Sequence, residues 1–305
     1  MIIRPNQHWF FRLFDWHGSV LSKITFRLML NILMSIIAVV SYQWYEHLGI
    51  HLTVAPFSLL GIAIAIFLGF RNNTSYSRFV EARALWGSLL ITQRSLLRQI
   101  KSIQPDETQL HQQFSVLLIA FSWSLKHQLR GTDPKEDLYR LLPAEIYAEI
   151  IRSPIPTNRL LLKMSLLLGE WRKRGLLSDI TYEMMDKNLN ELSHILGGCE
   201  RIAGTPVPFA YTLILQRTVY LFCTLLPFAL VTDLHYMTPF VSVFISYAFL
   251  SWDALAEELE DPFGTSPNDL PLNAICTVIE RHLMEMNDQT PLPALLQPNE
   301  KFNLL

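Results

Sequence analysis

Four long hydrophobic runs, separated by polar segments, dominate the pattern along the chain. A helix rises about 1.5 Å per residue, so the run at residues 52–70 would reach about 28 Å, close to the ~30 Å thickness of the hydrocarbon core of a bilayer. The other runs are also long enough to cross a membrane as helices. The pattern therefore predicts four membrane-spanning helices, at residues 28–45, 52–70, 205–230 and 234–252.

Two rows of side chains give the run at residues 52–70 its character. Small residues spaced by four let membrane helices approach closely. A row of bulky apolar residues, if several copies faced a common axis, would form stacked rings that gate water and ions. Alternatively the bulky row faces lipid or a neighbouring helix, and periodicity alone favours this alternative because membrane helices have apolar rows on every face. The small row is Gly61, Ala65 and Gly69, and the bulky row is Ile62, Ile66 and Phe70.

The middle of the chain, residues 71–204, has a different pattern. Apolar positions at helical spacing alternate with charges, as in FVEARALWGSLLITQRSLLRQI, which is typical of long amphipathic helices. Turn-forming residues predict breaks at 131–134 and 153–158, and Gly197 with Gly198 is interpreted as a helix end before the third run. We predict an all-α integral membrane protein, with four membrane helices and a cytoplasmic helical bundle.

Loop charges predict the orientation in the membrane. The loops at 46–51 and 231–236 contain no Lys or Arg, whereas the N-terminus and residues 71–200 contain many. By the positive-inside rule both termini are cytoplasmic, in a multi-pass protein of the inner (plasma) membrane.

Arg217, inside the third run, must snorkel to an interface or face protein or water. The predicted segments are 1–23 (N-terminal, cytoplasmic or interfacial), 24–70 (membrane helices 1 and 2), 71–204 (cytoplasmic helices), 205–256 (membrane helices 3 and 4) and 257–305 (cytoplasmic C-terminal segment).

Composition narrows the class of protein. Half of the 305 residues are hydrophobic, 17% are charged and the net charge is -2, so the chain offers no basic surface for nucleic acid. Three dispersed cysteines imply neither a disulfide framework nor a zinc site. The N-terminal segment lacks the pattern of a cleaved signal peptide. Its aromatic residues, which suit a membrane interface or an amphipathic lead-in to the soluble part, are Trp9, Phe10, Phe11, Phe14 and Trp16.

Two polar clusters contain residue types that could carry chemistry, but neither is convincing. One has the histidine spacing of a metal site but falls in a short loop with a glycine, so a solvated turn is the better interpretation. The other has the residue types of a hydrolase triad, too close together on one segment for triad geometry. With no phosphate-binding loop either, we do not expect an enzyme. The clusters are Glu46, His47 and His51, and Asp15, His17 and Ser19.

An acidic stretch follows the fourth hydrophobic run. Its carboxylates, followed by a Pro-Phe-Gly turn, could bind a cation or form a ring of negative charge at a pore mouth. A solvated acidic helix end is the simpler interpretation. The acidic residues are Glu257, Glu258, Glu260 and Asp261, with Asp269 after the turn.

Three blocks taken together resemble the bestrophins, specifically their bacterial homologues, over nearly the full chain. They are PFSLLGIAIAIFLGFRNNTSYSRFVEARALWG, TPVPFAYTLILQRTVYLFCTLLPFAL and LAEELEDPFGTSPNDLPLN. The resemblance implies a homopentameric ion channel with a central pore, four membrane helices per subunit and a cytoplasmic helical region that continues the pore. Its implied partners are permeant monovalent ions, the lipid bilayer and other copies of the chain. We expect no cofactor.

The resemblance also assigns roles to individual residues. It implies that Ile62, Ile66 and Phe70 form a narrow hydrophobic neck, which reverses the preference drawn from periodicity. A second constriction near the cytoplasmic exit falls on Ile180, in LSDITY.

The calcium-binding segment of the animal relatives is degenerate in this sequence. Glu258 and Asp261 occupy its earlier positions and Asp269 is retained, whereas residues 265–268 replace most of the acids. Fewer charged oxygens bind calcium more weakly, so we do not expect calcium gating and predict no firm metal site.

Charges near the apolar rings should set ion selectivity, because Ile and Phe do not choose a sign. Asp179, beside Ile180, and the acids at 257–261 favour cations such as sodium. Arg71 would favour anions if it faced the lumen. An anion (chloride) channel of the bestrophin type is therefore the alternative, and a non-conducting membrane scaffold is a third hypothesis.

Overall fold

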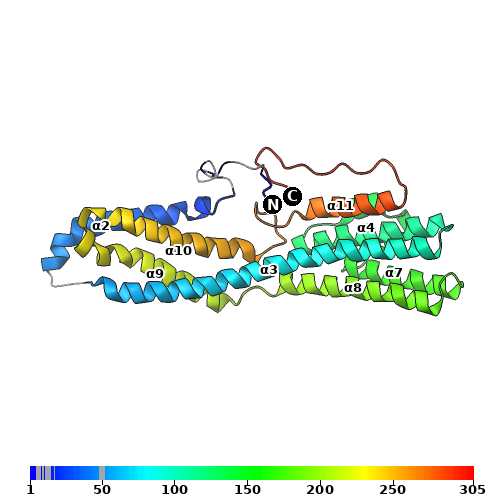
Figure 1. The fold of residues 1–305 in the computed structure, drawn as a ribbon, viewed down its shortest axis with the longest axis horizontal. Helices are drawn as coiled ribbons and strands as arrows, with labels where there is room; N and C mark the ends of the chain where they lie inside the picture. Colours follow the sequence, from blue (N-terminus) through cyan, green and yellow to red (C-terminus); the bar gives the residue numbers. More distant parts are fainter. Residues whose placement is uncertain (5–7, 9, 11–14, 17, 48–51) are drawn as a thin grey trace. The chain divides into compact units, whose positions relative to one another are not determined.

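The described part of the chain is helical (Figure 1), which confirms the predicted all-α class. The computed structural model describes residues 1–4, 8, 10, 15–16, 18–47 and 52–305, where the one extended pairing is an isolated bridge between Ile2 and Asn303. The helices of this part are α2 (Leu21–His47), α3 (Val54–Ile103), α4 (Thr108–Arg130), α5 (Lys135–Leu141), α6 (Ala144–Ile151), α7 (Pro156–Lys173), α8 (Asp179–Gly204), α9 (Phe209–Leu234), the 3-10 helix η1 (His235–Met237), α10 (Thr238–Glu260) and α11 (Leu272–Met286). Trp9, Phe11, Phe14, His17 and His51, named above for the interface and the two polar clusters, lie outside the described residues.

The chain forms two compact units. One, called the hydrophobic unit, comprises Arg4–Phe79 and Pro206–Asp261. The other, called the amphipathic unit, comprises Met1–Ile3, Val80–Thr205 and Pro262–Leu305. Helix α3 contributes its first half to the hydrophobic unit and its second half to the amphipathic unit.

The hydrophobic unit contains the stretches that can cross a membrane. In the described residues these are Leu21–Trp44, Val54–Ile103 and Phe209–Glu260. The third stretch holds two helices, because the chain turns at η1 and α10 returns beside α9 (Figure 1). Helices α2, α9 and α10 contact one another around a core that includes Val219, Phe222 and Leu250. The chain is therefore a membrane protein.

A proline inside α9 explains one of the contacts that join these helices. Pro227 has no backbone N–H, so the carbonyl of Cys223, four residues earlier, loses its helical hydrogen bond. The amide of Asn31, on α2, donates to that carbonyl over 2.6 Å. The hydroxyl of Ser242, on α10, donates to Asn31 Oδ1 over 3.3 Å. A buried asparagine thus supplies the bond that proline removes and connects three helices, as a lipid environment requires.

Helix α3 does not end where its composition changes. The hydrophobic run stops at Phe70 and polar residues begin at Arg71, yet the helix continues without interruption from Val54 to Ile103. At about 1.5 Å per residue, such a helix is ~75 Å long. Apolar side chains suit a helix in lipid and polar side chains suit one in water, but the hydrogen bonds between backbone groups within the helix are the same in both surroundings. The helix can therefore continue where the composition changes.

The amphipathic unit packs around α4, which contacts α5, α7, α8 and α11. Its core includes the buried side chains of Trp86, Phe114, Phe121 and Trp171. The predicted breaks coincide with helix ends: α4 stops at Arg130, before a left-handed Gly131, and α7 begins at Pro156.

The predicted helix end at Gly197 and Gly198 is wrong. Both glycines lie inside α8, which continues to Gly204. Gly198 serves packing instead, because a Cβ atom there would lie only 2.9 Å from Cδ1 of Leu85 on α3. Glycine allows this close approach of two helices at a modest cost in helix propensity.

Candidate functional site

The bulky row of α3 points away from the core of the hydrophobic unit. Ile62, Ile66 and Phe70 are 61%, 53% and 61% exposed, whereas Ile64 and Leu68, on another side of the same helix, are buried. Side chains at i and i+4 lie above one another, so the three form one continuous apolar row. This row is available to contact something outside the subunit.

The small row is only partly used for packing within the subunit. A Cβ atom on Gly61 would lie 3.4 Å from Cζ of Phe222, so this glycine allows α9 to come close. A Cβ atom on Gly69 would meet nothing within 4 Å. Close approach of helices, expected along the whole row, is therefore seen at Gly61 and not at Gly69.

Arg71 follows the bulky row but turns into the protein. Its side chain is buried and pairs with the carboxylate of Asp253, on α10, which is also buried. Its Nη2 lies 3.7 Å from a carboxylate oxygen of Glu260. A buried arginine needs such partners, because an unpaired charge in a low-dielectric interior is very costly. Arg71 therefore places no net charge beside the bulky row.

The acidic stretch at the end of α10 divides into two kinds of residue. Glu258 is buried and pairs with Lys23 over 3.1 Å. A carboxylate oxygen of Glu260 accepts a hydrogen bond from the backbone N–H of Val207 over 3.2 Å, in addition to its contact with Arg71. Glu257 and Asp261 are exposed. Two of the four acids thus take part in packing the unit, and two face its surface.

The loop that resembles a calcium-binding segment is closed by protein groups. A carboxylate oxygen of Asp269 accepts a hydrogen bond from the backbone N–H of Ser266 over 2.6 Å. The guanidinium of Arg130, at the end of α4, donates to the carbonyls of Phe263 and Leu270 and to Oδ1 of Asn273. In the part of the chain that the structure describes, no three His, Cys, Asp or Glu side chains gather as metal ligands would. Arg130 supplies the positive charge in this loop.

Ile180 and Asp179 project from the start of α8. The helix is capped by Ser178, whose hydroxyl accepts from the backbone N–H of Thr181 over 3.2 Å. Ile180 is largely exposed, although it is apolar. The exposed carboxylate of Asp179 accepts a hydrogen bond from Nε of Arg172 over 2.7 Å, which offsets part of its charge.

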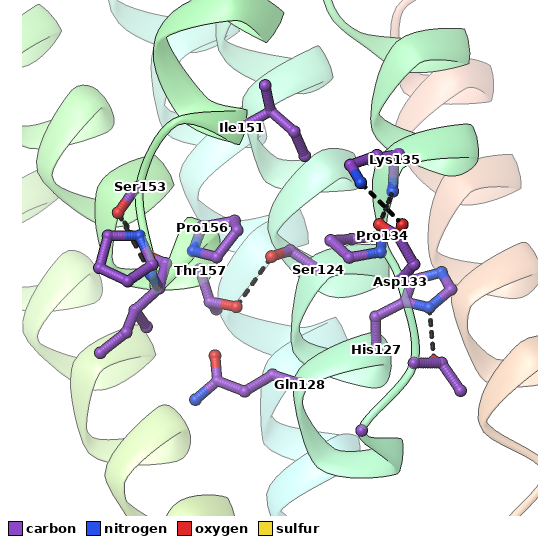
Figure 2. Close-up of a pocket in the computed structure, with 14 residues that line it drawn as sticks. Ser124, His127, Gln128, Asp133, Pro134, Lys135, Ile151, Ser153, Pro156 and Thr157 are labelled. Carbon is purple, nitrogen blue, oxygen red and sulfur yellow. Dashed lines mark hydrogen bonds and ion pairs between the residues drawn. The ribbon is translucent and has the colours of Figure 1, made fainter.

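A separate cavity of about 350 Å³ lies in the amphipathic unit, between the end of α4 and the start of α7 (Figure 2). The imidazole of His127 lies between the hydroxyl of Thr132, at 2.6 Å, and the carboxylate of Asp137, at 2.8 Å. The hydroxyls of Ser124 and Thr157 are hydrogen-bonded to each other over 2.8 Å. These contacts connect α4 to α5 and to α7.

The sequence patterns did not identify two of the residues that make these contacts, Asp253 and Asn31. Asp253 and Asn31 stand inside hydrophobic runs or at their ends, where a polar residue indicates a buried partner or a function. A polar residue in a hydrophobic run can therefore be noticed in the sequence, but the sequence does not indicate which residue is its partner. Asp253 pairs with a residue 182 positions away, and Asn31 with one 192 positions away.

Comparisons with known proteins agree with the resemblance. The family described as bacterial/fungal bestrophin protein matches residues 1–285. The chain is 57% identical to the voltage-dependent anion channel-forming protein YneE of Escherichia coli, over the whole of both sequences. It is 44% identical to a voltage-dependent anion channel-forming protein of Ralstonia nicotianae, over 92% of each. The crystal structure of a bacterial bestrophin homologue from Klebsiella pneumoniae is 71% identical, with a TM-score of 0.86, covering 88% of this chain and 100% of that one.

Proposed function

Since the chain belongs to the bestrophin family of bacteria and fungi, we propose that it conducts monovalent ions across a membrane through a central pore. One observation carries the proposal: three bulky apolar side chains, each more than half exposed, form a row on a membrane helix whose other side is packed. Repeated around an axis, the row would make stacked apolar rings narrow enough to gate ions by dewetting. In this proposal Ile62, Ile66 and Phe70 are the neck, and Ile180 forms a second constriction.

The proposed channel is a homopentamer in the inner membrane, with four crossings per subunit. The turn at η1 supports two crossings within Phe209–Glu260, in addition to those of α2 and α3. The absence of Lys and Arg from residues 46–51 and 231–236 supports an outer position for these two segments. Both termini, the helices of residues 71–204 and the segment 257–305 are then cytoplasmic.

Anions such as chloride are the first candidates for the permeant ion. The support is the name of the relatives, which are anion channel-forming proteins. This replaces the preference for cations that the acidic residues alone suggested.

Cations such as sodium remain a second candidate because of a specific observation. The argument for anions from Arg71 required that its charge face the lumen, but Arg71 is buried against Asp253. The exposed charges of this group of candidate residues are acidic: Asp179, Glu257 and Asp261. Exposed acids near a pore mouth would concentrate cations.

The reversal potential decides between the two ions. Purified protein in a planar bilayer, with unequal NaCl on the two sides, should give a reversal potential near that of chloride for an anion channel. For a cation channel the sign is opposite. A bilayer that conducts no more than a protein-free control would overturn the proposal in favour of a scaffold.

The neck is tested by removing its bulk. The triple variant I62A/I66A/F70A should raise ion flux into liposomes by about tenfold or more, since lowering a barrier by ~1.4 kcal/mol has that effect. The matched control is L60A/F67A, which removes two exposed side chains on another side of the same helix, away from the row. Equal flux from the triple variant and the unmodified protein would contradict the assignment.

A further inference from the structure

A cavity in the hydrophobic unit has the character of a lipid site. Its volume is about 410 Å³, and it lies between α2, α9 and α10. Most of its wall is apolar, and Phe26 at its edge is 78% exposed. The lining residues are Phe26, Arg27, Leu30, Asn31, Tyr220, Cys223, Thr224 and Leu250.

One lining residue, Arg27, has a guanidinium with unused donors. Its Cζ lies 5.1 Å above the ring of Tyr220. Its Nη1 is buried without a hydrogen-bond partner, and the nearest carboxylate oxygen, Oδ2 of Asp253, is 4.0 Å away. That distance permits attraction but no hydrogen bond. Arg71 pairs with the other oxygen of Asp253, and Oδ2 itself has no hydrogen-bond partner, so Nη1 of Arg27 faces it through charge attraction alone.

The Arg27 side chain is 34% exposed, so donors of its guanidinium other than Nη1 can reach a ligand that accepts hydrogen bonds. Arginine binds phosphate groups with two parallel hydrogen bonds, and its charge matches theirs. Arg27 stands in the second turn of α2, within the stretch Leu21–Trp44 that can cross a membrane. Basic pockets between membrane helices near the cytoplasmic side are places where anionic lipid headgroups bind.

We propose that this cavity binds an anionic phospholipid, with the phosphate on Arg27 and an acyl chain along Phe26, Leu30 and Leu250. An apolar wall gives no affinity to a free inorganic phosphate, whereas it suits a hydrocarbon chain. Thr224 also lines the cavity; its hydroxyl donates to the carbonyl of Tyr220 over 2.7 Å and can still accept a hydrogen bond from a hydroxyl of a glycerol headgroup. This proposal requires the membrane character of the chain and is independent of which ion it conducts.

The test measures which lipids the full-length protein retains. The protein is reconstituted in bilayers of phosphatidylethanolamine and phosphatidylglycerol, purified again, and the bound phospholipids are quantified by mass spectrometry. We expect phosphatidylglycerol to be enriched over its share of the bilayer. The variant R27Q should reduce this enrichment by about tenfold, the loss expected for a charge-assisted pair, and R27K should reduce it less.

Two further variants separate the cavity from general effects of charge and folding. T224F leaves Arg27 intact but fills the cavity, so it should also abolish the enrichment. R217Q is the matched control, because Arg217 is an exposed arginine of α9 that does not line the cavity. It should retain the lipid as the unmodified protein does. If R27Q fails to fold, the lipid enrichment of T224F compared with that of R217Q still tests whether the cavity binds the lipid.

Three results would overturn the proposal. One is equal enrichment in the unmodified protein and in T224F. Another is displacement of phosphatidylglycerol by excess inorganic phosphate, which would indicate a small-anion site. The third is no enrichment in the unmodified protein, as expected if a second copy of the chain covers the cavity.

Discussion

The two units of the molecule treat polar side chains in opposite ways. In the hydrophobic unit several such groups are buried and bound across helices, as with Arg71 and Asp253 or Asn31 and Cys223. In the amphipathic unit ion pairs are frequent and often exposed, as with Glu81 and Arg201. Water can replace a lost partner at an exposed site but not in a membrane interior. The same type of contact should therefore contribute very differently to stability in the two units.

The largest effect is expected at Asp253. The variant D253A leaves the buried guanidinium of Arg71 without its carboxylate, which should lower the free energy of unfolding by about 3–5 kcal/mol. Chemical unfolding in detergent, followed by circular dichroism, measures the change. E257Q, an exposed acid of the same helix, should change stability little. A loss at D253A no larger than at E257Q would contradict the proposed cost of an unpaired buried charge.

The replacement of both partners sharpens this prediction. R71L/D253L exchanges the buried pair for apolar side chains, so it should be more stable than D253A. If the double variant is as unstable as D253A, the cost lies in packing rather than in the unpaired charge. The comparison uses the same unfolding measurement.

A smaller loss is expected at Asn31. N31L leaves the carbonyl of Cys223 without a hydrogen bond beside Pro227, at a cost of about 1–3 kcal/mol. The control is S58A, because Ser58 is exposed and donates only to a carbonyl of its own helix. An intact melting temperature for N31L would show that another group, such as water, satisfies the carbonyl.

In the amphipathic unit the expected effect at Asp137 depends on pH. Burial by itself would raise the pKa of Asp137, but hydrogen bonds from His127 and Lys126 outweigh it and hold the pKa below its ordinary value. A lowered pKa in the folded state stabilises the protein above the unfolded pKa of about 4, and this contribution is lost as the pH falls through the folded value. D137N should therefore cost about 1–2 kcal/mol near pH 7, and the difference should shrink as the pH falls below about 4 and through the lowered pKa of the folded state.

Circular dichroism at the two pH values measures this difference. E136Q, an exposed neighbour on α5, serves as the control and should behave as the unmodified protein does at both. A gap between D137N and the unmodified protein that stays constant with pH would contradict the role of the carboxylate charge.

The smallest effect is expected at the exposed pair of Glu81 and Arg201. Both partners can be hydrated, so E81Q should change the free energy of unfolding by less than about 0.5 kcal/mol. Added salt should reduce even that, because it screens exposed charges. A loss at E81Q comparable to that at D253A would remove the contrast between the two units.

Periodicity and composition determined much of this protein without the structure. The all-helical class, the hydrophobic stretches and the breaks at 131–134 and 153–158 depend on neighbours in sequence, so local patterns reveal them. Three sequence blocks also carried the resemblance to the bestrophins, which the family match over residues 1–285 confirms. The roles of Ile62, Ile66, Phe70 and Ile180 in a pore stay predictions.

Tertiary structure alone decided which polar residues meet. Nothing near Arg71 in sequence indicates that it turns into the protein toward Asp253, and nothing near Glu258 indicates Lys23 as its partner. The same holds for Gly198, which looks like a helix end but receives Leu85 of another helix. Such pairings depend on how helices pack. Packing brings together residues that are far apart in the sequence, at separations that follow no regular spacing. Sequence patterns describe one helix at a time, whereas the partner that stabilises a buried charge lies on a neighbouring helix.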